Sequence, residues 1–330
     1  MSSYEVRVGS PGVPLNAGAV PFEPRQEVVL PPLYYFGGVV RPSETSVLPP
    51  PGCFLLEEDP FEKRVETPLS SSEKNNKLHE LLSERIPIGI NSKRGGVGDK
   101  RDLGSVSLYG ILWYLQNGDE YYRRVVKREC LVGSACNAAL VADDPRGKDL
   151  SYTDIDMTFD MPVDMAKIGY EQIFSWVENK VLYALAQACH CNFREDPSLI
   201  PEELKAFCDL QEYSDALVGL IKRKYLQNLM PLYGDGNCRV LLSYGQGEDK
   251  VDLNFVVKTK GDHDILAHSN QIKIGRGHRP VHMIRALPGK LALSREQILE
   301  RKAVFHKPRD IKFGLWRAFI RMKQGYECSL

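Results

Sequence analysis

One segment in the middle of the chain constrains the fold more than any other feature. Gly133 and Ser134 follow an apolar run, and a second run over residues 152–157 carries Asp154 and Asp156. A glycine-serine turn lets bare backbone and one hydroxyl approach a phosphate, and carboxylates at positions i and i+2 of a strand project to the same side. Magnesium is usually held by one or two carboxylates together with substrate phosphates. The segment therefore predicts a site for a nucleotide and a divalent cation.

A third carboxylate lies far downstream, in a run that reads as a buried strand. Asp252 interrupts the β-branched and apolar residues 250–257, which follow residues 239–244 across a hairpin signal. A buried strand rarely carries a carboxylate without a partner. Three carboxylates on two strands match the needs of two-metal phosphoryl transfer. We therefore predict that Asp154, Asp156 and Asp252 bind metal and act in catalysis, and that Gly133 and Ser134 bind the nucleotide phosphates.

The distribution of proline and charge divides the chain into three parts. Of its 21 prolines, 12 fall within residues 1–72, which predicts an extended or disordered arm. This arm is either a mobile tail or a segment that binds a protein partner. Residues 73–265 would form the catalytic domain. Residues 266–330 would form a smaller, mainly helical part that is basic, with 14 lysines and arginines against three acids between residues 271 and 323.

Hydrophobic periodicity predicts an α+β fold, in which helices flank a mixed sheet and the smaller helical part packs beside it. Leu78, Leu81 and Leu82 recur at helical spacing in a helix that begins near residue 73. We expect helices over residues 73–85, 105–115, 170–188 and 202–229, and a further helix that starts at residue 137. We expect strands over residues 123–131, 152–157, 239–244 and 250–257.

Composition excludes several classes of protein. Forty-three basic residues balance 43 acidic ones, so the net charge gives no general attraction to nucleic acid or membrane. Eight cysteines without a CxxC pair indicate reduced thiols in an intracellular protein. The chain shows no signal-peptide pattern and no apolar run long enough to span a membrane. We therefore expect a protein of the cytoplasm or the nucleus.

In these motifs and the segments around them, the chain resembles terminal nucleotidyltransferase family five, the cytoplasmic template-independent poly(A) polymerases of the polymerase-β nucleotidyltransferase superfamily. The segments that carry the resemblance are residues 78–88, 133–135, 152–156, 252–256, 269–274 and 301–311. The resemblance implies a polymerase-β-like sheet, ATP as donor, Mg²⁺ or Mn²⁺ as metal and the 3′ end of an RNA as acceptor. The third carboxylate of that family is usually glutamate, whereas this chain has Asp252.

Basic residues in the second half of the chain are candidates for contact with RNA phosphates. They are Lys222, Arg223, Lys224, Arg276, Arg279, Lys307, Arg309, Lys312 and Arg317. For the first three, a solvated helix face is an equally good interpretation. Three functions stay open: addition of AMP to mRNA 3′ ends, nucleotide transfer to a protein or small molecule, and a catalytically weak module that binds RNA or protein.

Overall fold

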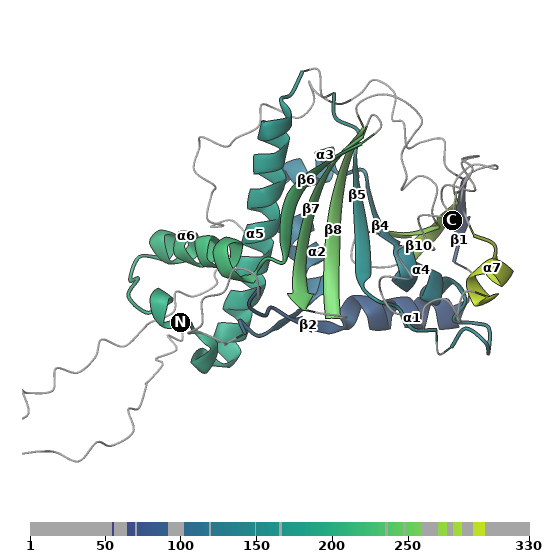
Figure 1. Ribbon diagram of the computed structural model, residues 1–330, viewed down its shortest axis with the longest axis horizontal. Coiled ribbons are helices and arrows are strands. Elements are labelled where there is room, and N and C mark those ends of the chain that lie inside the picture. Colours follow the sequence, from purple (N-terminus) through teal and green to yellow (C-terminus); the bar gives the residue numbers. More distant parts are fainter. Residues whose placement is uncertain are drawn as a thin grey trace, which may run out of the picture.

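The structure is a computed structural model of the 330-residue chain (Figure 1). It describes residue 55 and residues 65–69, 71–91, 102–118, 120–148, 150–164, 167–234, 237–246, 249–258, 270–275, 280–285 and 293–300. These residues form a mixed α+β structure in which one large sheet is lined by helices. The predicted α+β class is therefore confirmed at this level.

The large sheet is mixed and joins strands from distant parts of the chain. Its order is β1 (Val65–Pro68), β10 (Pro280–Arg285), β9 (Gln271–Ile274), β4 (Arg128–Val132), β5 (Ile155–Met161), β8 (Asp249–Lys258), β7 (Asn237–Gln246) and β6 (Asn228–Gly234). Strands β5 and β8 pair in parallel, and the other neighbouring strands described in this sheet pair antiparallel. A separate pair is formed by β2 (Arg85–Pro87) and β3 (Ser105–Ser107).

Alternation along β5 and β8 separates an apolar face from a polar face. Side chains of successive strand residues point to opposite faces, and the odd-numbered residues of β5, and of β8 from Val251 to Val257, are apolar and buried. Phe159 and Phe255 stack within this apolar face at a ring-centroid distance of 4.3 Å. The even-numbered Asp156 and Asp252 consequently share the opposite face, where they are paired neighbours in the parallel register.

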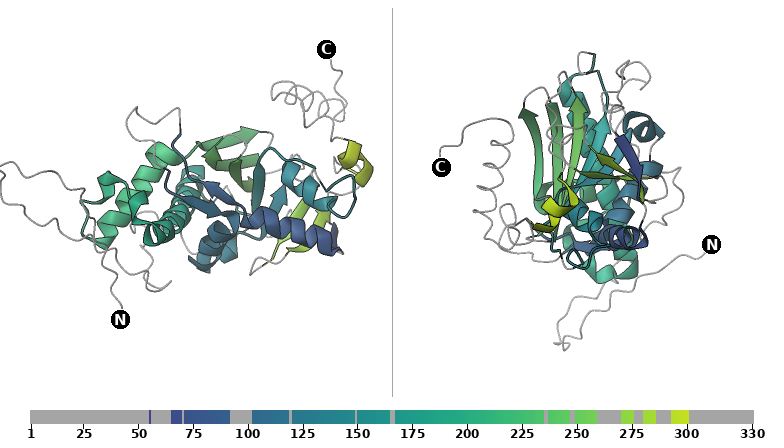
Figure 2. Two further views of the ribbon diagram at one scale, coloured as in Figure 1. Left: turned by 90° about the horizontal axis from the view of Figure 1, so that it is seen from below. Right: turned by 90° about the vertical axis from the view of Figure 1, so that its right-hand side faces the viewer.

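Helices cover the apolar face (Figure 2). They are α1 (Ser72–Ser83), α2 (Leu108–Gly118), α3 (Glu120–Val125) and α5 (Tyr170–Glu195). Helix α4 (Gly133–Leu140) packs directly against β4, β5 and β9, whereas α6 (Leu210–Leu220) and α7 (Arg295–Glu300) lie farther out. Ser71 caps α1 by accepting a hydrogen bond from the Lys74 backbone amide. Leu78, Leu81 and Leu82 are buried on the inner face of α1, as their helical spacing predicts. This packing holds α1 beside α4 and close to the ends of the central strands.

Several local predictions are confirmed. The hairpin predicted over residues 239–257 is formed by β7 and β8, and the helix predicted over residues 170–188 is α5, which continues to Glu195. The glycine-serine turn follows β4, as expected. The start predicted for the next helix, residue 137, was wrong, because α4 begins at Gly133 itself and ends at Leu140.

Three further local predictions were wrong in part. Residues 105–107 form a strand before α2 begins, and residues 123–125 belong to helix α3 because Tyr122 and Val125 are buried at helical spacing. The single helix predicted over residues 202–229 is broken. It becomes a 3₁₀ turn at Glu202–Leu204, helix α6, a π-helical turn at Ile221–Tyr225 and the first residues of β6. Asp209 caps α6 through two backbone amides, which starts a new helix there.

The division at residues 73 and 266 stays a prediction. Strand β1 comes from the proline-rich arm, and β9 and β10 come from the basic C-terminal part, where α7 is the described helix. All three strands belong to the sheet that carries Asp156 and Asp252. Among the residues that the structure describes, no helix is long and apolar enough to cross a lipid bilayer.

Candidate functional site

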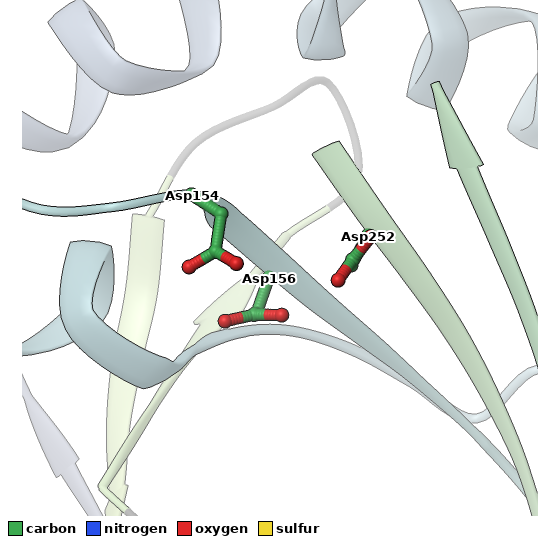
Figure 3. Close-up of side chains that lie close together, drawn as sticks. All are labelled: Asp154, Asp156 and Asp252. Atoms are coloured by element: carbon green, nitrogen blue, oxygen red, sulfur yellow. The ribbon is translucent and has the colours of Figure 1, made fainter. Parts of the chain in front are cut away.

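Three carboxylates meet at the ends where β5 and β8 begin (Figure 3). Asp154 lies immediately before β5, Asp156 is the second residue of that strand, and Asp252 lies on β8. One carboxylate oxygen from each residue lies within 4.8 Å of the other two. Because Asp156 and Asp252 are paired across a parallel ladder, the strand register itself fixes their separation. The predicted set of metal ligands therefore converges in space.

The electrostatics of this cluster favour a bound cation. Burial raises the pKa of Asp156 well above its usual value, and the charges of Asp154 and Asp252 raise it further. Asp252 is 9% exposed, and its Oδ1 atom is buried with no hydrogen-bond partner among the described residues. A buried oxygen without a partner is costly. Carboxylate oxygens are the ligands that hard divalent cations prefer, so the donor set fits Mg²⁺ or Mn²⁺.

Lys250 is the cationic partner of this cluster. Its Nζ atom lies 2.7 Å from Oδ2 of Asp252, and the two residues lie two positions apart on β8. The Lys250 charge also opposes the rise in the pKa of Asp156. Lys250 is not among the site residues predicted from the sequence. The i and i+2 spacing in a predicted strand was the signal that could have identified it.

Gly133 brings the backbone against the carboxylates. Its φ of +69° lies in the left-handed region that favours glycine. A Cβ atom built at this position would lie 2.5 Å from Oδ2 of Asp156, well inside any ordinary contact. The turn at the start of α4 is therefore tight enough that any side chain would collide with the carboxylate. The amide groups of the first turn of α4 are suited to an anion, because helix N-termini attract phosphates.

Ser134 connects this turn to the segment before β5. Its Oγ atom accepts a hydrogen bond from the Thr153 backbone amide at 3.3 Å. The Thr153 hydroxyl donates in turn to Oδ1 of Asp154 at 2.8 Å. The serine hydroxyl keeps its own proton for another acceptor, such as a phosphate oxygen. The two predicted nucleotide-binding residues and the first carboxylate therefore form one connected unit.

A tyrosine anchors the segment before Asp154 to helix α1. The Tyr152 hydroxyl donates a short hydrogen bond to the carboxylate of Glu84, the residue that follows α1. Burial and the Glu84 carboxylate raise the pKa of Tyr152. Neither residue had been identified from the sequence as part of the site, because no local pattern indicates that they meet. They position the carboxylate segment from outside the cluster.

The candidate RNA-binding residues fall into two groups. Lys222 forms an ion pair with Glu178, Lys224 forms one with Glu203, and Arg223 is exposed. These three residues lie in the π-helical turn that follows α6. Lys222 and Lys224 therefore already have acidic partners within the protein. The remaining six lie outside the described residues: Arg276, Arg279, Lys307, Arg309, Lys312 and Arg317. Contact with RNA stays a prediction for all nine.

The chain was also compared with known proteins. No protein-family model matches the sequence, and the search of curated proteins finds no matching sequence.

Proposed function

We propose that this protein is a template-independent RNA adenylyltransferase that adds AMP from ATP to mRNA 3′ ends. The observation that carries the proposal is the convergence of Asp154, Asp156 and Asp252 within 4.8 Å, beside the turn at Gly133 and Ser134. Nucleotidyl transfer requires carboxylates that share divalent cations next to a turn that binds phosphate. On this proposal the sheet is a polymerase-β-like nucleotidyltransferase sheet, and the reaction takes place in the cytoplasm or the nucleus.

Each residue has a defined part in the proposed reaction. Asp154, Asp156 and Asp252 would hold Mg²⁺ or Mn²⁺, which supplies charge stabilisation and lowers the pKa of an attacking hydroxyl. The Ser134 hydroxyl and the amides at the start of α4 would orient the triphosphate of ATP. Tyr152 and Thr153 keep the Asp154 segment in place through their hydrogen bonds. The chain thus supplies orientation and a fixed arrangement of charge.

RNA is the proposed acceptor for two reasons. The region from residue 271 to 323 contains 14 lysines and arginines and three acids, although the whole chain is electrically neutral. Local positive charge of this kind attracts a phosphate backbone. The resemblance to the cytoplasmic poly(A) polymerases points to the same acceptor. A protein partner that binds through the proline-rich arm belongs to this proposal as well.

The direct test is primer extension. The full chain is incubated with a labelled oligo(A) primer, ATP and Mg²⁺ or Mn²⁺, beside a variant with Asp154→Asn and Asp156→Asn. We expect extension by the wild type and loss by the variant. Asp215→Asn is a suitable control, because Asp215 lies on α6 and accepts a hydrogen bond from Tyr183. No extension by the wild type, or equal extension by the double variant, would contradict the proposal.

Ribonuclease treatment of the labelled product and calorimetry separate the other two functions. If label from ATP enters a product that survives ribonuclease, the acceptor is a protein or a small molecule. If ATP and metal bind weakly in calorimetry and no labelled product forms, the chain is a binding module. Each of these results would replace RNA adenylylation as the function of the site.

A further inference from the structure

Lys250 sits where a cation would bind the cluster. Its ammonium group contacts Oδ2 of Asp252, while Oδ1 of the same carboxylate is buried and has no hydrogen-bond partner among the described residues. The ion pair is well shielded, with side-chain exposures of 17% for Lys250 and 13% for Asp252. Shielded charges interact more strongly than exposed ones, because less water screens them. The charge of Lys250 therefore contributes strongly to the electrostatic potential at the carboxylate cluster.

The charge of the cluster decides how many divalent ions it can hold. With all three carboxylates ionised, as a bound metal requires, they and the ammonium group carry a net charge of −2, which a single divalent ion neutralises. A second ion would leave a net positive charge in a buried site and would have to compete with the ammonium group for Asp252. A nucleoside triphosphate adds several negative charges and so restores the balance for two ions.

We propose that Lys250 is a positioning residue that restricts the nucleotide-free site to one divalent ion. The second ion then binds at Asp252 together with the nucleoside triphosphate, whose phosphates compete with Asp252 for the ammonium group. Binding of metal and of nucleotide are in this way coupled, which prevents a fully loaded metal site without substrate. The inference rests on the proposed function, since it assigns the cluster to a nucleotide and its metal ions.

The test counts bound Mn²⁺ by electron paramagnetic resonance during titration of the full chain without nucleotide. We expect one tightly bound ion in the wild type and two in Lys250→Met. The second ion should bind Lys250→Met with at least about tenfold higher affinity than it binds the wild type. Lys250→Arg retains the positive charge and should retain the wild-type count. A non-hydrolysable ATP analogue should raise the wild-type count to two.

Two controls make the result specific. Lys77→Met removes a lysine whose ion pair with Glu80 has the same 2.7 Å length but lies on α1, and it should leave the count unchanged. Adding Asp252→Asn to Lys250→Met should remove the second ion. If Lys250→Met unfolds, as judged by thermal melting, Lys250→Gln provides the same test with a polar side chain.

The outcomes for this inference and for the proposed function are distinct. Two tight ions in the nucleotide-free wild type, or equal counts and affinities in wild type and Lys250→Met, would overturn the role of Lys250. Absence of Mn²⁺ binding in every variant would overturn both proposals, because the cluster would then hold no metal. The expected counts combined with a lack of RNA extension would overturn the RNA acceptor and leave the role of Lys250 intact.

Discussion

Gly133→Ala tests whether the turn at the start of α4 holds the carboxylates in place. The φ of +69° at this residue costs a side chain about 1–2 kcal/mol in the left-handed region. For a folded unit of this size, that cost corresponds to a fall in Tm of about 2–8 °C. The control is Gly110→Ala in α2, where the new Cβ would lie 3.6 Å from Ser107 Oγ. Helical alanine there should stabilise the protein by about 0.5–1 kcal/mol.

The second effect of Gly133→Ala is on the metal site. The new Cβ would lie 2.5 Å from Oδ2 of Asp156, whereas ordinary contacts begin at 3.4 Å, so the oxygen must move by about 0.9 Å. Metal-ligand distances tolerate about 0.2 Å. Because the Asp156 side chain is short and lies against the turn, it cannot move aside without losing its place in the cluster. We expect the affinity for Mn²⁺ to fall by about 10- to 100-fold.

Differential scanning calorimetry and a Mn²⁺ titration measure the two effects separately. Gly133→Ala should lower both Tm and Mn²⁺ affinity, whereas Gly110→Ala should raise Tm slightly and leave the affinity unchanged. A Gly133→Ala protein with unchanged Tm and unchanged Mn²⁺ affinity would refute the argument. A lower Tm with normal affinity would show that the backbone is strained but that the collision with Asp156 is relieved without cost to the site.

Three further predictions address charge, anchoring and RNA contact. Burial and the charges of Asp154 and Asp252 raise the pKa of Asp156, so the folded protein keeps the proton on this carboxyl to higher pH than the unfolded chain does. The metal-free protein should therefore lose stability as the pH rises above about 4. Asp156→Asn should remove this component and stabilise the metal-free protein at pH 7 by about 1 kcal/mol in chemical denaturation, and an unchanged pH profile would contradict this. Tyr152→Phe removes the hydrogen bond to Glu84 and should cost about 1 kcal/mol in urea unfolding together with part of the extension rate, so a variant equal to wild type in both would exclude the anchoring role. Arg223→Ala should reduce the slope of log affinity for single-stranded RNA against log salt concentration by about 0.7. Lys222→Ala should change this slope less, because Lys222 is paired with Glu178. Equal slopes for the wild type and Arg223→Ala would show that this turn does not contact RNA.

Apolar, β-branched runs on either side of a turn signal were sufficient to predict the hairpin of β7 and β8, and the i and i+2 spacing of Asp154 and Asp156 predicted the strand that carries Asp156. In these segments the side-chain period of two places apolar residues on the face that packs on helices, although the structure also buries residues on the other face of β5. The same approach failed at residues 105–107 and 123–125, where short segments fit either pattern. Prediction also failed over residues 202–229, where a helical pattern continues past the cap at Asp209 and into a strand. Short segments take the structure that their neighbours in space stabilise.

The sequence by itself identified the three aspartates and the glycine-serine turn as candidates and predicted that Asp156 and Asp252 lie on strands, because strand patterns and a glycine-serine turn are local properties. Only the tertiary structure decided that β5 and β8 pair in parallel with Asp156 beside Asp252, that Lys250 holds one oxygen of Asp252, and that Tyr152 meets Glu84. Asp156 and Asp252 are 96 positions apart in the chain, and their pairing depends on burial of the whole apolar face against α1, α2 and α5. Long-range strand pairing follows from that shared core, which no local pattern encodes.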